Sequence, residues 1–262
     1  MTGISGLALV TGASCGVGFA LAGQFARRGY DLIVADSYDE IHTAAAALAV
    51  FGTDVEPVQV DMQCVDAADV LHRRAVAAPR PVVAAALSTP LRDALFLDGS
   101  LDSALELVDV NVRGTLQLAR LLADEMVTHD GGGIILTASP ADPMAGLDTA
   151  VYSASSAFLR AFAEMLQDEL GRSGVKVAAL MPAPGAQSVG GFVDMLWAMM
   201  GRAPTNDPAD IARHAFEALT SDDKQSIVVW AADAVTSLAS RLIPDHVKGP
   251  VRQIISPTGE AV

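Results

Sequence analysis

A glycine-rich stretch, Thr11-Gly12-Ala13-Ser14-Cys15-Gly16-Val17-Gly18, stands near the start of the chain. It follows a short apolar run at 7–11 and precedes a segment of helical spacing at 19–28, so it joins an expected strand to an expected helix. Glycine permits a tight turn and a close backbone approach, and the unpaired N–H groups at a helix N-terminus attract a pyrophosphate. The stretch therefore predicts a nucleotide-binding turn, with ordinary packing of a glycine turn as the alternative.

Apolar runs and Ala/Leu-rich helical segments alternate along the whole chain, as expected for a parallel sheet flanked by helices. Further strands are expected at 30–35, 55–60, 82–87, 134–138, 175–181 and 227–230, and further helices at 42–51, 67–77, 101–129, 152–172 and 208–219. We therefore predict an α/β protein: a single domain over residues 1–262, with a Rossmann-type, doubly wound parallel sheet of about seven strands and helices on both faces.

The composition is that of a protein with a large core. Of the 262 residues, 51% are hydrophobic and 18% are charged, which excludes global disorder. The formal net charge of −14 repels phosphate backbones, so nucleic-acid binding is not expected. Two cysteines, Cys15 and Cys64, cannot form a disulfide framework, and we find neither a secretory signal nor an apolar stretch long enough for stable membrane insertion. A cytoplasmic location is expected, and the five scattered histidines indicate no metal site.

Asp36 ends the second expected strand, 18 residues after Gly18. An acidic residue roughly 20 residues beyond the glycine turn binds the hydroxyl groups of an adenosine ribose. The same carboxylate would repel a 2′-phosphate, and no Arg or Lys follows nearby to offset it. NAD(H) is therefore favoured over NADP(H) as the cofactor, and a solvated aspartate at a strand end is the alternative.

The spacing T-G-x-x-x-G-x-G resembles the cofactor loop of the short-chain dehydrogenase/reductase family, and the likeness extends from about residue 5 to residue 185. The resemblance implies that Asp61 and Met62, at the end of the third strand, contact the adenine. It implies the following set of cofactor-binding residues: Gly12, Ser14, Cys15, Gly16, Val17, Gly18, Asp36, Asp61, Met62, Ala84 and Pro182.

The same resemblance assigns three catalytic residues. Asn111, in the segment Asn111-Val112-Arg113-Gly114, matches the family's N-x-x-G motif, whose asparagine helps to organise a proton relay. Ser139 ends the fifth strand and Tyr152 follows 13 residues later, a spacing that matches the family's catalytic serine and tyrosine. In such a site one hydroxyl exchanges a proton with a carbonyl oxygen as hydride moves, and a second hydroxyl orients that oxygen. The alternative is structural: a tyrosine at a helix start and a serine that caps a loop.

Three departures from the family pattern fall in this site. The family motif Y-x-x-x-K has Ser156 at its lysine position, one helical turn from Tyr152. Because Ser156 carries no charge, the pKa of Tyr152 is expected to stay near the ordinary tyrosine value of about 10, which affects carbonyl reduction less than alcohol oxidation. The segment Ala84-Ala85-Ala86-Leu87 replaces N-N-A-G, and Met181-Pro182-Ala183-Pro184-Gly185 carries a displaced Pro-Gly. These departures indicate either altered chemistry or none.

Two further features concern a substrate and a partner. The stretch at 190–201 is bounded by glycines, apolar and rich in methionine, and the segment around it, at about 186–207, is expected to cover a hydrophobic or aromatic substrate. Core packing or a subunit contact is the alternative. The family resemblance also implies a homodimer or homotetramer that pairs through the helices at 101–129 and 152–172.

Two functions compete on these grounds. The first is an NAD(P)(H)-dependent oxidoreductase that reduces a carbonyl of a hydrophobic or aromatic small molecule, with Tyr152 as the acid and Ser139 as its partner. The alternative is a non-redox protein of the same fold: an isomerase, a cyclase, a lyase-type enzyme, or an inactive binding or partner subunit. The complete glycine turn and Asp36 favour the first, whereas Ser156 and the replacement at 84–87 favour the second.

Overall fold

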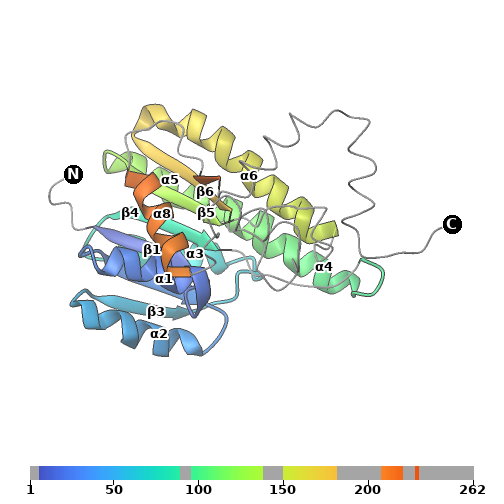
Figure 1. The fold of residues 1–262 in the computed structure, drawn as a ribbon, viewed down its shortest axis with the longest axis horizontal. Coiled ribbons are helices and arrows are strands. Elements are labelled where there is room, and N and C mark those ends of the chain that lie inside the picture. Colours follow the sequence, from blue (N-terminus) through green and yellow to red (C-terminus); the bar gives the residue numbers. More distant parts are fainter. Residues whose placement is uncertain (1–5, 89–95, 138–149, 182–207, 221–227, 230–262) are drawn as a thin grey trace, which may run out of the picture.

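The computed structural model describes residues 6–88, 96–137, 150–181, 208–220 and 228–229. Within these residues, seven parallel strands form one sheet in the order β3-β2-β1-β4-β5-β6-β7 (Figure 1). The strands are β1 (Leu7–Thr11), β2 (Asp31–Asp36), β3 (Val55–Gln59), β4 (Val82–Ser88), β5 (Gly132–Thr137), β6 (Val175–Met181) and β7 (Val228–Val229). The predicted doubly wound parallel sheet is confirmed.

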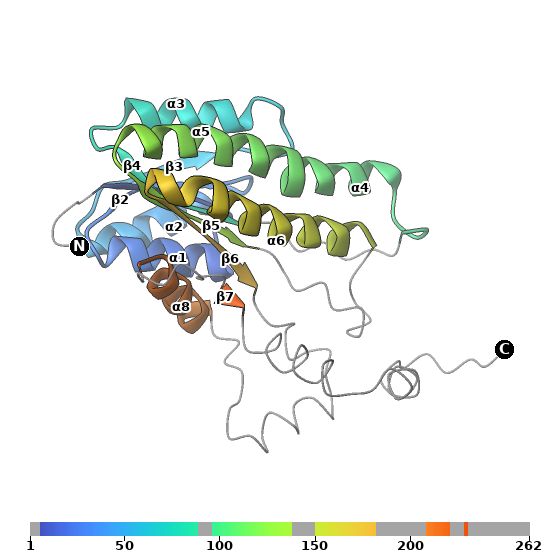
Figure 2. The ribbon, with the colours of Figure 1, turned by 90° about the horizontal axis from the view of Figure 1, so that it is seen from above.

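Helices cover both faces of this sheet. Figure 2 shows α1, α2 and α8 on one side and α3, α4, α5 and α6 on the other. The α-helices are α1 (Gly16–Ala26), α2 (Glu40–Leu48), α3 (Ala67–Ala77), α4 (Leu101–Val108), α5 (Thr115–Thr128), α6 (Ala150–Leu170) and α8 (Pro208–Thr220). Shorter turns are η1 (Ala49–Phe51), η2 (Asp109–Gly114) and η3 (Gly171–Ser173). The helix expected at 42–51 is therefore α2 followed by the 3₁₀ turn η1.

The central strand β1 shows how the core is divided. Its side chains alternate between the two faces of the sheet, so Leu9 packs with α3 and α5 while Val10 packs with α1 and α2. All five residues of β1 are buried. A strand covered by helices on both faces is apolar throughout, which explains why β1 reads as a continuous apolar run and not as an alternating one.

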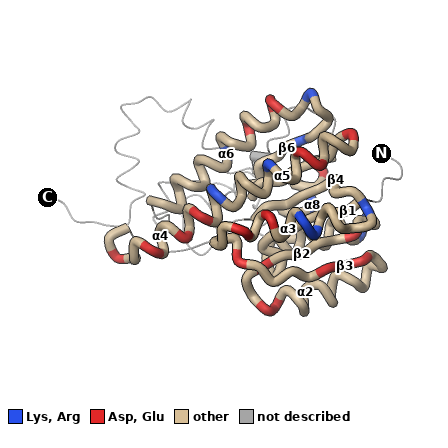
Figure 3. Tube along the Cα trace, turned by 180° about the vertical axis from the view of Figure 1, so that it is seen from behind, with Lys and Arg blue, Asp and Glu red and all other residues tan. Residues whose placement is uncertain are grey.

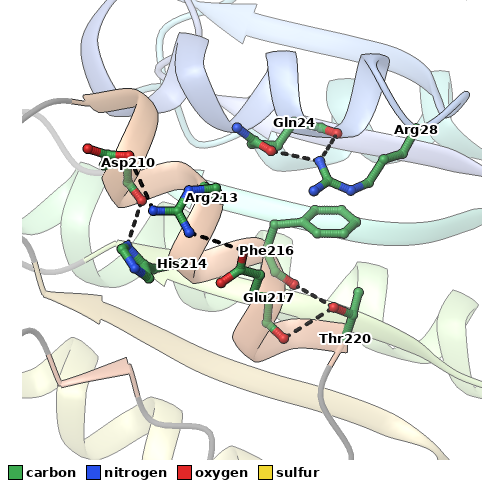
Figure 4. A network of polar contacts seen from close by, with 8 residues as sticks. All are labelled: Gln24, Arg28, Asp210, Arg213, His214, Phe216, Glu217 and Thr220. Carbon is green, nitrogen blue, oxygen red and sulfur yellow. Dashed lines mark hydrogen bonds and ion pairs between the residues drawn. The ribbon is translucent and has the colours of Figure 1, made fainter.

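The helix α8 is fastened to α1, the helix that follows the glycine-rich stretch (Figure 4). On α1, Gln24 accepts a hydrogen bond of 2.7 Å from the guanidinium of Arg28, and that guanidinium lies 4.0 Å from the centre of the Phe216 ring of α8. The rings of Phe25 and Phe216 meet edge to face, with their centres 5.3 Å apart. α8 thus packs beside α1 on the same face of the sheet, and these contacts help to fix the helix that begins at the glycine turn.

The long helix expected at 101–129 is present, and a π-helical turn changes its hydrogen bonding in the middle. α4 ends at Val108, the six residues Asp109–Gly114 form the π-helical turn η2, and α5 begins at Thr115. A π turn adds a residue to the helix and changes the hydrogen-bond register there. The hydroxyl of Thr115 donates a hydrogen bond of 3.0 Å to the carbonyl oxygen of Val110, which ties this turn to the start of α5. The insertion falls on Asn111, a candidate site residue, and π turns are frequent at functional sites.

The strand order reverses between β1 and β4. From β1 the chain builds outward to β2 and β3, then returns to place β4 on the other side of β1. In open α/β sheets, ligands bind outside the carboxyl ends of the strands at such a switch point. The glycine-rich stretch follows β1 directly and therefore lies at this position.

Candidate functional site

The glycine turn has the backbone geometry that the sequence predicts. Gly12 and Gly16 have φ angles of 64° and 57°, in the left-handed region that favours glycine. A Cβ added at Gly16 would meet nothing within 4 Å, so the turn leaves open space there. A Cβ added at Gly18 would instead overlap the carbonyl oxygen of Gly12, because α1 begins in direct contact with the turn. The turn thus combines a close helix–strand contact with a free backbone surface.

Asp36 lies next to this turn. One carboxylate oxygen of Asp36 accepts a hydrogen bond of 3.2 Å from the backbone N–H of Ser14, and the other accepts one of 2.8 Å from Ser37. Two backbone donors thus orient the carboxylate at the end of β2, while its oxygens keep lone pairs for further donors. The hydroxyl oxygen of Ser14 is buried and has no hydrogen-bond partner in the described structure. Cys15 and Val17 follow Ser14 in the turn. Cys15 is exposed and Val17 is half-buried.

Three hydroxyl residues connect the carboxyl ends of the central strands. Thr11, Ser88 and Thr137 are the last residues of β1, β4 and β5. The Thr11 hydroxyl accepts a hydrogen bond of 3.0 Å from the backbone N–H of Ser88, whose own hydroxyl lies 3.3 Å from that of Thr137. Sequence reasoning missed this set, although a hydroxyl residue at the end of each of three expected strands was a signal that could have found it.

Ala84, expected among the cofactor-binding residues, lies inside β4 and is 2% exposed. It packs in the core on the α1 side of the sheet, whereas Ser88 stands at the carboxyl end of the same strand. The segment 84–87 is buried along its whole length. The group that this strand brings to the switch point is therefore the Ser88 hydroxyl.

The catalytic candidates Asn111 and Tyr152 are brought together by η2 and α6. Asn111 is fully buried, and its side-chain amide donates a hydrogen bond of 2.9 Å to the hydroxyl of Ser155. Ser155 in turn donates one of 2.9 Å to the carbonyl oxygen of Tyr152, whose side chain is 4% exposed. Ser155 was not among the predicted residues. Its position three residues after Tyr152, on the same face of α6, is what joins the two candidates.

Two buried oxygens at this end of the site have no hydrogen-bond partner in the described structure: the side-chain carbonyl of Asn111 and the hydroxyl of Ser156. Ser156 is 1% exposed and stands one turn along α6 from Tyr152. A buried polar atom is normally paired with protein, water or a ligand. Together with the Ser14 hydroxyl at the glycine turn, these atoms provide unused hydrogen-bonding capacity at both ends of the candidate site.

The adenine-side candidates Asp61 and Met62 follow β3. The Asp61 carboxylate accepts a hydrogen bond of 3.0 Å from the backbone N–H of Gln63, which closes this loop on itself. Asp61 is half-buried, and Met62 packs partly against the hydrophobic core. The remaining candidates, Ser139 and Pro182, and the substrate-covering segment at 186–207 lie outside the described residues.

The described part of the chain contains neither a cluster of metal-binding side chains nor a helix suited to cross a membrane. No group of three or more His, Cys, Asp or Glu side chains there could hold a metal ion. The helices described there lack the length or the hydropathy that a membrane crossing requires.

Comparison with known proteins identifies the class. Residues 6–191 match the family model described as short chain dehydrogenase. The chain belongs to this family. A relative from Bacillus subtilis, named uncharacterized oxidoreductase YmfI, is 32% identical over 186 residues, which is 68% of this chain and 74% of that protein. The family resemblance that the sequence indicated is therefore confirmed.

Solved structures of similar fold include two with defined ligands or substrates. L-sorbose reductase from Gluconobacter frateurii, complexed with NADPH and L-sorbose, has a TM-score of 0.71 at 22% identity, over 86% of this chain and 94% of that one. An alcohol dehydrogenase from Comamonas testosteroni, specific for bulky-bulky ketones, has a TM-score of 0.74 at 20% identity, over 99% and 98% of the two chains. At these identities the likeness establishes the fold of the family and nothing about the substrate of this member.

Proposed function

We propose that the protein is a nicotinamide-dependent carbonyl reductase that acts on a hydrophobic or aromatic small molecule and prefers NAD(H) to NADP(H). The observation that carries this proposal is the buried hydrogen-bonded chain from Asn111 through Ser155 to Tyr152, on elements that meet at the same sheet as the glycine turn. The chain ends at the backbone carbonyl oxygen of Tyr152, so it holds the start of α6, the helix that carries the phenol. A tyrosine on a helix held in this way can serve as a general acid.

The residues present fit a dinucleotide. The open space over Gly16 and the unpaired Ser14 hydroxyl would receive the pyrophosphate at the N-terminus of α1. Asp36 would hold the adenosine ribose, and Asp61 and Met62 would contact the adenine. When bound, a nicotinamide supplies the hydride, whereas the protein provides binding, orientation and the proton.

Tyr152 would donate its phenolic proton to the carbonyl oxygen of the substrate, and Ser139 would orient that oxygen. The Asn111–Ser155 pair holds the backbone of Tyr152 and leaves the Asn111 carbonyl available to a further donor such as water. Because Ser156 contributes no positive charge that would stabilise a phenolate, the neutral phenol, which is the acid that reduction needs, is favoured. We therefore propose reduction as the favoured direction.

A non-redox function is the second candidate, and Ser156 is the observation that favours it. A buried hydroxyl without a partner in the described structure occupies the position at which the family has its lysine. If that position no longer serves hydride chemistry, the same pocket could support isomerisation, cyclisation, elimination or binding alone. Turnover of NADH with hydrophobic ketones separates the two candidates.

Cofactor preference is the first testable consequence. We expect the wild type to bind NADH more tightly than NADPH in calorimetric titration, because the Asp36 carboxylate accepts bonds from ribose hydroxyls and repels a 2′-phosphate. Asp36→Ala should weaken NADH binding roughly tenfold or more and remove the discrimination against NADPH, since a hydrogen bond to a charged group contributes about 1.5–3 kcal/mol.

Asp124→Ala is the matched control for this change in net charge. Asp124 is 55% exposed and pairs with Arg120 on α5, away from the glycine turn. It should leave both affinities as they are in the wild type. Equal or tighter binding of NADPH by the wild type would show that Asp36 does not face the ribose, and failure of both nucleotides to bind would contradict the proposed function itself.

Self-association is a further consequence of the proposal. Leu101, Leu105 and Val108 lie on one face of α4 and are 70%, 52% and 38% exposed, between the acidic residues that Figure 3 marks on this helix. On α6, the other helix of the expected subunit contact, Met165 is 56% exposed. We propose that these exposed apolar residues contact a second copy, giving a homodimer or homotetramer through the helices at 101–129 and 152–172.

Light scattering of the purified protein at micromolar concentration tests this proposal. The wild type should have the mass of a dimer or tetramer, and Leu105→Glu should shift it toward the smaller species, because a charge would be buried in the contact. Val76→Glu, on the outer face of α3 and 56% exposed, is the matched control and should leave the mass unchanged. A monomeric wild type would overturn the oligomer proposal alone.

A further inference from the structure

We propose that Arg113 is a positioning residue that couples the adenine end of the nucleotide site to the proton-relay end. The inference rests on the proposed nucleotide-binding function and goes beyond it, because Arg113 is outside every set of residues assigned above to cofactor or catalysis. It concerns how one half of the ligand affects the residues that serve the other half.

Arg113 bridges two segments that are 50 residues apart in the sequence. One guanidinium N–H donates a hydrogen bond of 2.7 Å to the backbone carbonyl oxygen of Gln63, in the loop after β3. The Nε–H donates one of 2.9 Å to the carboxylate of Asp109, at the start of η2. The Arg113 side chain is 35% exposed, so the bridge is partly shielded from water. A planar guanidinium can serve both acceptors at once with fixed geometry.

On the adenine side, Arg113 bonds to the short loop at 61–63, which also has a hydrogen bond of its own. Gln63 donates its backbone N–H to Asp61, so the residue held by Arg113 is also held by an adenine candidate. Gly114 lies against the same loop, and a Cβ added there would come within 2.9 Å of the carbonyl oxygen of Met62. The loop and η2 are therefore in backbone contact, and no side chain separates them.

On the relay side, Arg113 belongs to the same π turn as Asn111. Asn111 bonds to Ser155, and Ser155 bonds to the carbonyl oxygen of Tyr152. Hydrogen bonds join Asp61 to Arg113 through Gln63, and a second set joins Asn111 to the backbone of Tyr152 through Ser155. The covalent chain of η2 connects the two sets, and Arg113 is the side chain that ties the loop to η2. The proposed coupling requires that η2 change its position or register when the loop is fixed.

The consequence is that binding of the adenine part of the ligand is coupled to the arrangement of the residues at the relay end. When adenine occupies the loop at 61–63, the loop is fixed, Arg113 fixes η2, and Asn111 is held in the position that bonds Ser155. Coupling of this kind is reciprocal, so a ligand at the relay end must also strengthen binding at the adenine end. Removal of the Arg113 guanidinium should leave the loop at 61–63 and the relay residues folded. A ligand bound at one of these ends should then no longer affect the other.

Amide hydrogen exchange with ADP-ribose as the probe tests the inference, because ADP-ribose carries the adenine half and lacks the nicotinamide. In the wild type, ADP-ribose should slow exchange in the loop at 61–64 and also at 109–115 and 150–156. In Arg113→Met the loop should still be protected, while the protection at 109–115 and 150–156 is lost and ADP-ribose affinity falls roughly three- to tenfold.

Two further variants distinguish coupling from general stabilisation. Arg120→Met removes an arginine of α5 that forms a similar ion pair with the residue four positions away, at 3.2 Å, and it should behave as the wild type. Arg113→Lys retains the charge beside Asp109 but cannot serve Gln63 at the same time, so it should resemble Arg113→Met. All variants should melt within a few degrees of one another.

Each outcome decides the inference. Ligand-induced protection at 109–115 that persists in Arg113→Met would overturn it, as would full recovery in Arg113→Lys. A wild type that does not bind ADP-ribose would contradict the proposed function and the inference together, and the wild-type arm alone reveals that case. Wild-type binding with protection confined to 61–64 would overturn the inference and leave the proposed function standing.

Discussion

Tyr152→Phe is expected to lower the rate of NADH-dependent ketone reduction by roughly a hundredfold to ten-thousandfold, the usual contribution of a positioned general acid. The substitution retains the ring, which is 4% exposed and packed at the start of α6, and removes only the hydroxyl that would donate the proton. NADH binding in calorimetric titration should change little. The rate is measured as loss of NADH absorbance with a panel of hydrophobic and aromatic ketones.

The matched control is Tyr30→Phe. Tyr30 is a half-buried tyrosine whose ring meets those of Phe25 and Phe216, far from the carboxyl ends of the strands. Burial raises the pKa of the Tyr30 phenol, with a smaller lowering by Arg28, so this residue is also neutral at physiological pH. Its replacement should leave turnover unchanged. NADH binding without turnover, unaffected by Tyr152→Phe, would instead contradict the reductase and favour the non-redox candidate.

The direction of the reaction depends on Ser156. With no positive charge at this position to lower the pKa of the Tyr152 phenol, the reductase should remain active as pH rises from neutral. Ser156→Lys would place an ammonium one helical turn from the phenol and lower that pKa. The loss of reduction should then begin at lower pH, and alcohol oxidation, which needs the phenolate, should increase at neutral pH. Ser156 is 1% exposed, so a lysine at this position should also lower the stability of the fold. Melting temperatures are therefore measured together with these rates.

Local sequence was sufficient to predict the sheet and the nucleotide end of the site. The central strands β1 and β4 are largely buried and appear as continuous apolar runs. β1, α3 and β6 lie where they were expected. The left-handed angles at Gly12 and Gly16 follow from the same residues that carry the glycine pattern. Asp36 lies beside the turn because β1 and β2 are paired neighbours, which a strand–turn–helix–strand unit makes predictable.

The relay end could not be derived in the same way, because its contacts join residues far apart in sequence. Asn111 and Ser155 are 44 residues apart. The Thr11 hydroxyl meets the backbone N–H of Ser88, and the Thr137 hydroxyl meets that of Ser88, only because β4 lies between β1 and β5. The π turn at 109–114 was missed for a different reason. One additional residue in a helix hardly alters an apolar pattern that runs for nearly thirty residues, so hydrophobic periodicity cannot locate it.

Gly18→Ala is expected to destabilise the protein by about 3 kcal/mol, at the upper end of the cost of overpacking, and to abolish measurable NADH binding. The added Cβ would overlap the carbonyl oxygen of Gly12 and come within 2.7 Å of its carbonyl carbon. Both atoms belong to the backbone, so no side-chain rotation can relieve the overlap. The start of α1 must move away from the end of β1, and the glycine turn must move with it. Urea denaturation and calorimetric titration measure the two effects.

Two glycines of the same segment provide the controls that make this result specific. Gly23→Ala places a Cβ in the interior of α1, where the nearest atoms are 3.9 Å away, and should stabilise the helix by up to about 1 kcal/mol. Gly16→Ala meets no atom within 4 Å but has a φ of 57°, so it should cost only the strain of a left-handed residue, about 1–2 kcal/mol. If Gly18→Ala were as stable as Gly23→Ala and still bound NADH, the close contact between α1 and the turn would not be what shapes the nucleotide site.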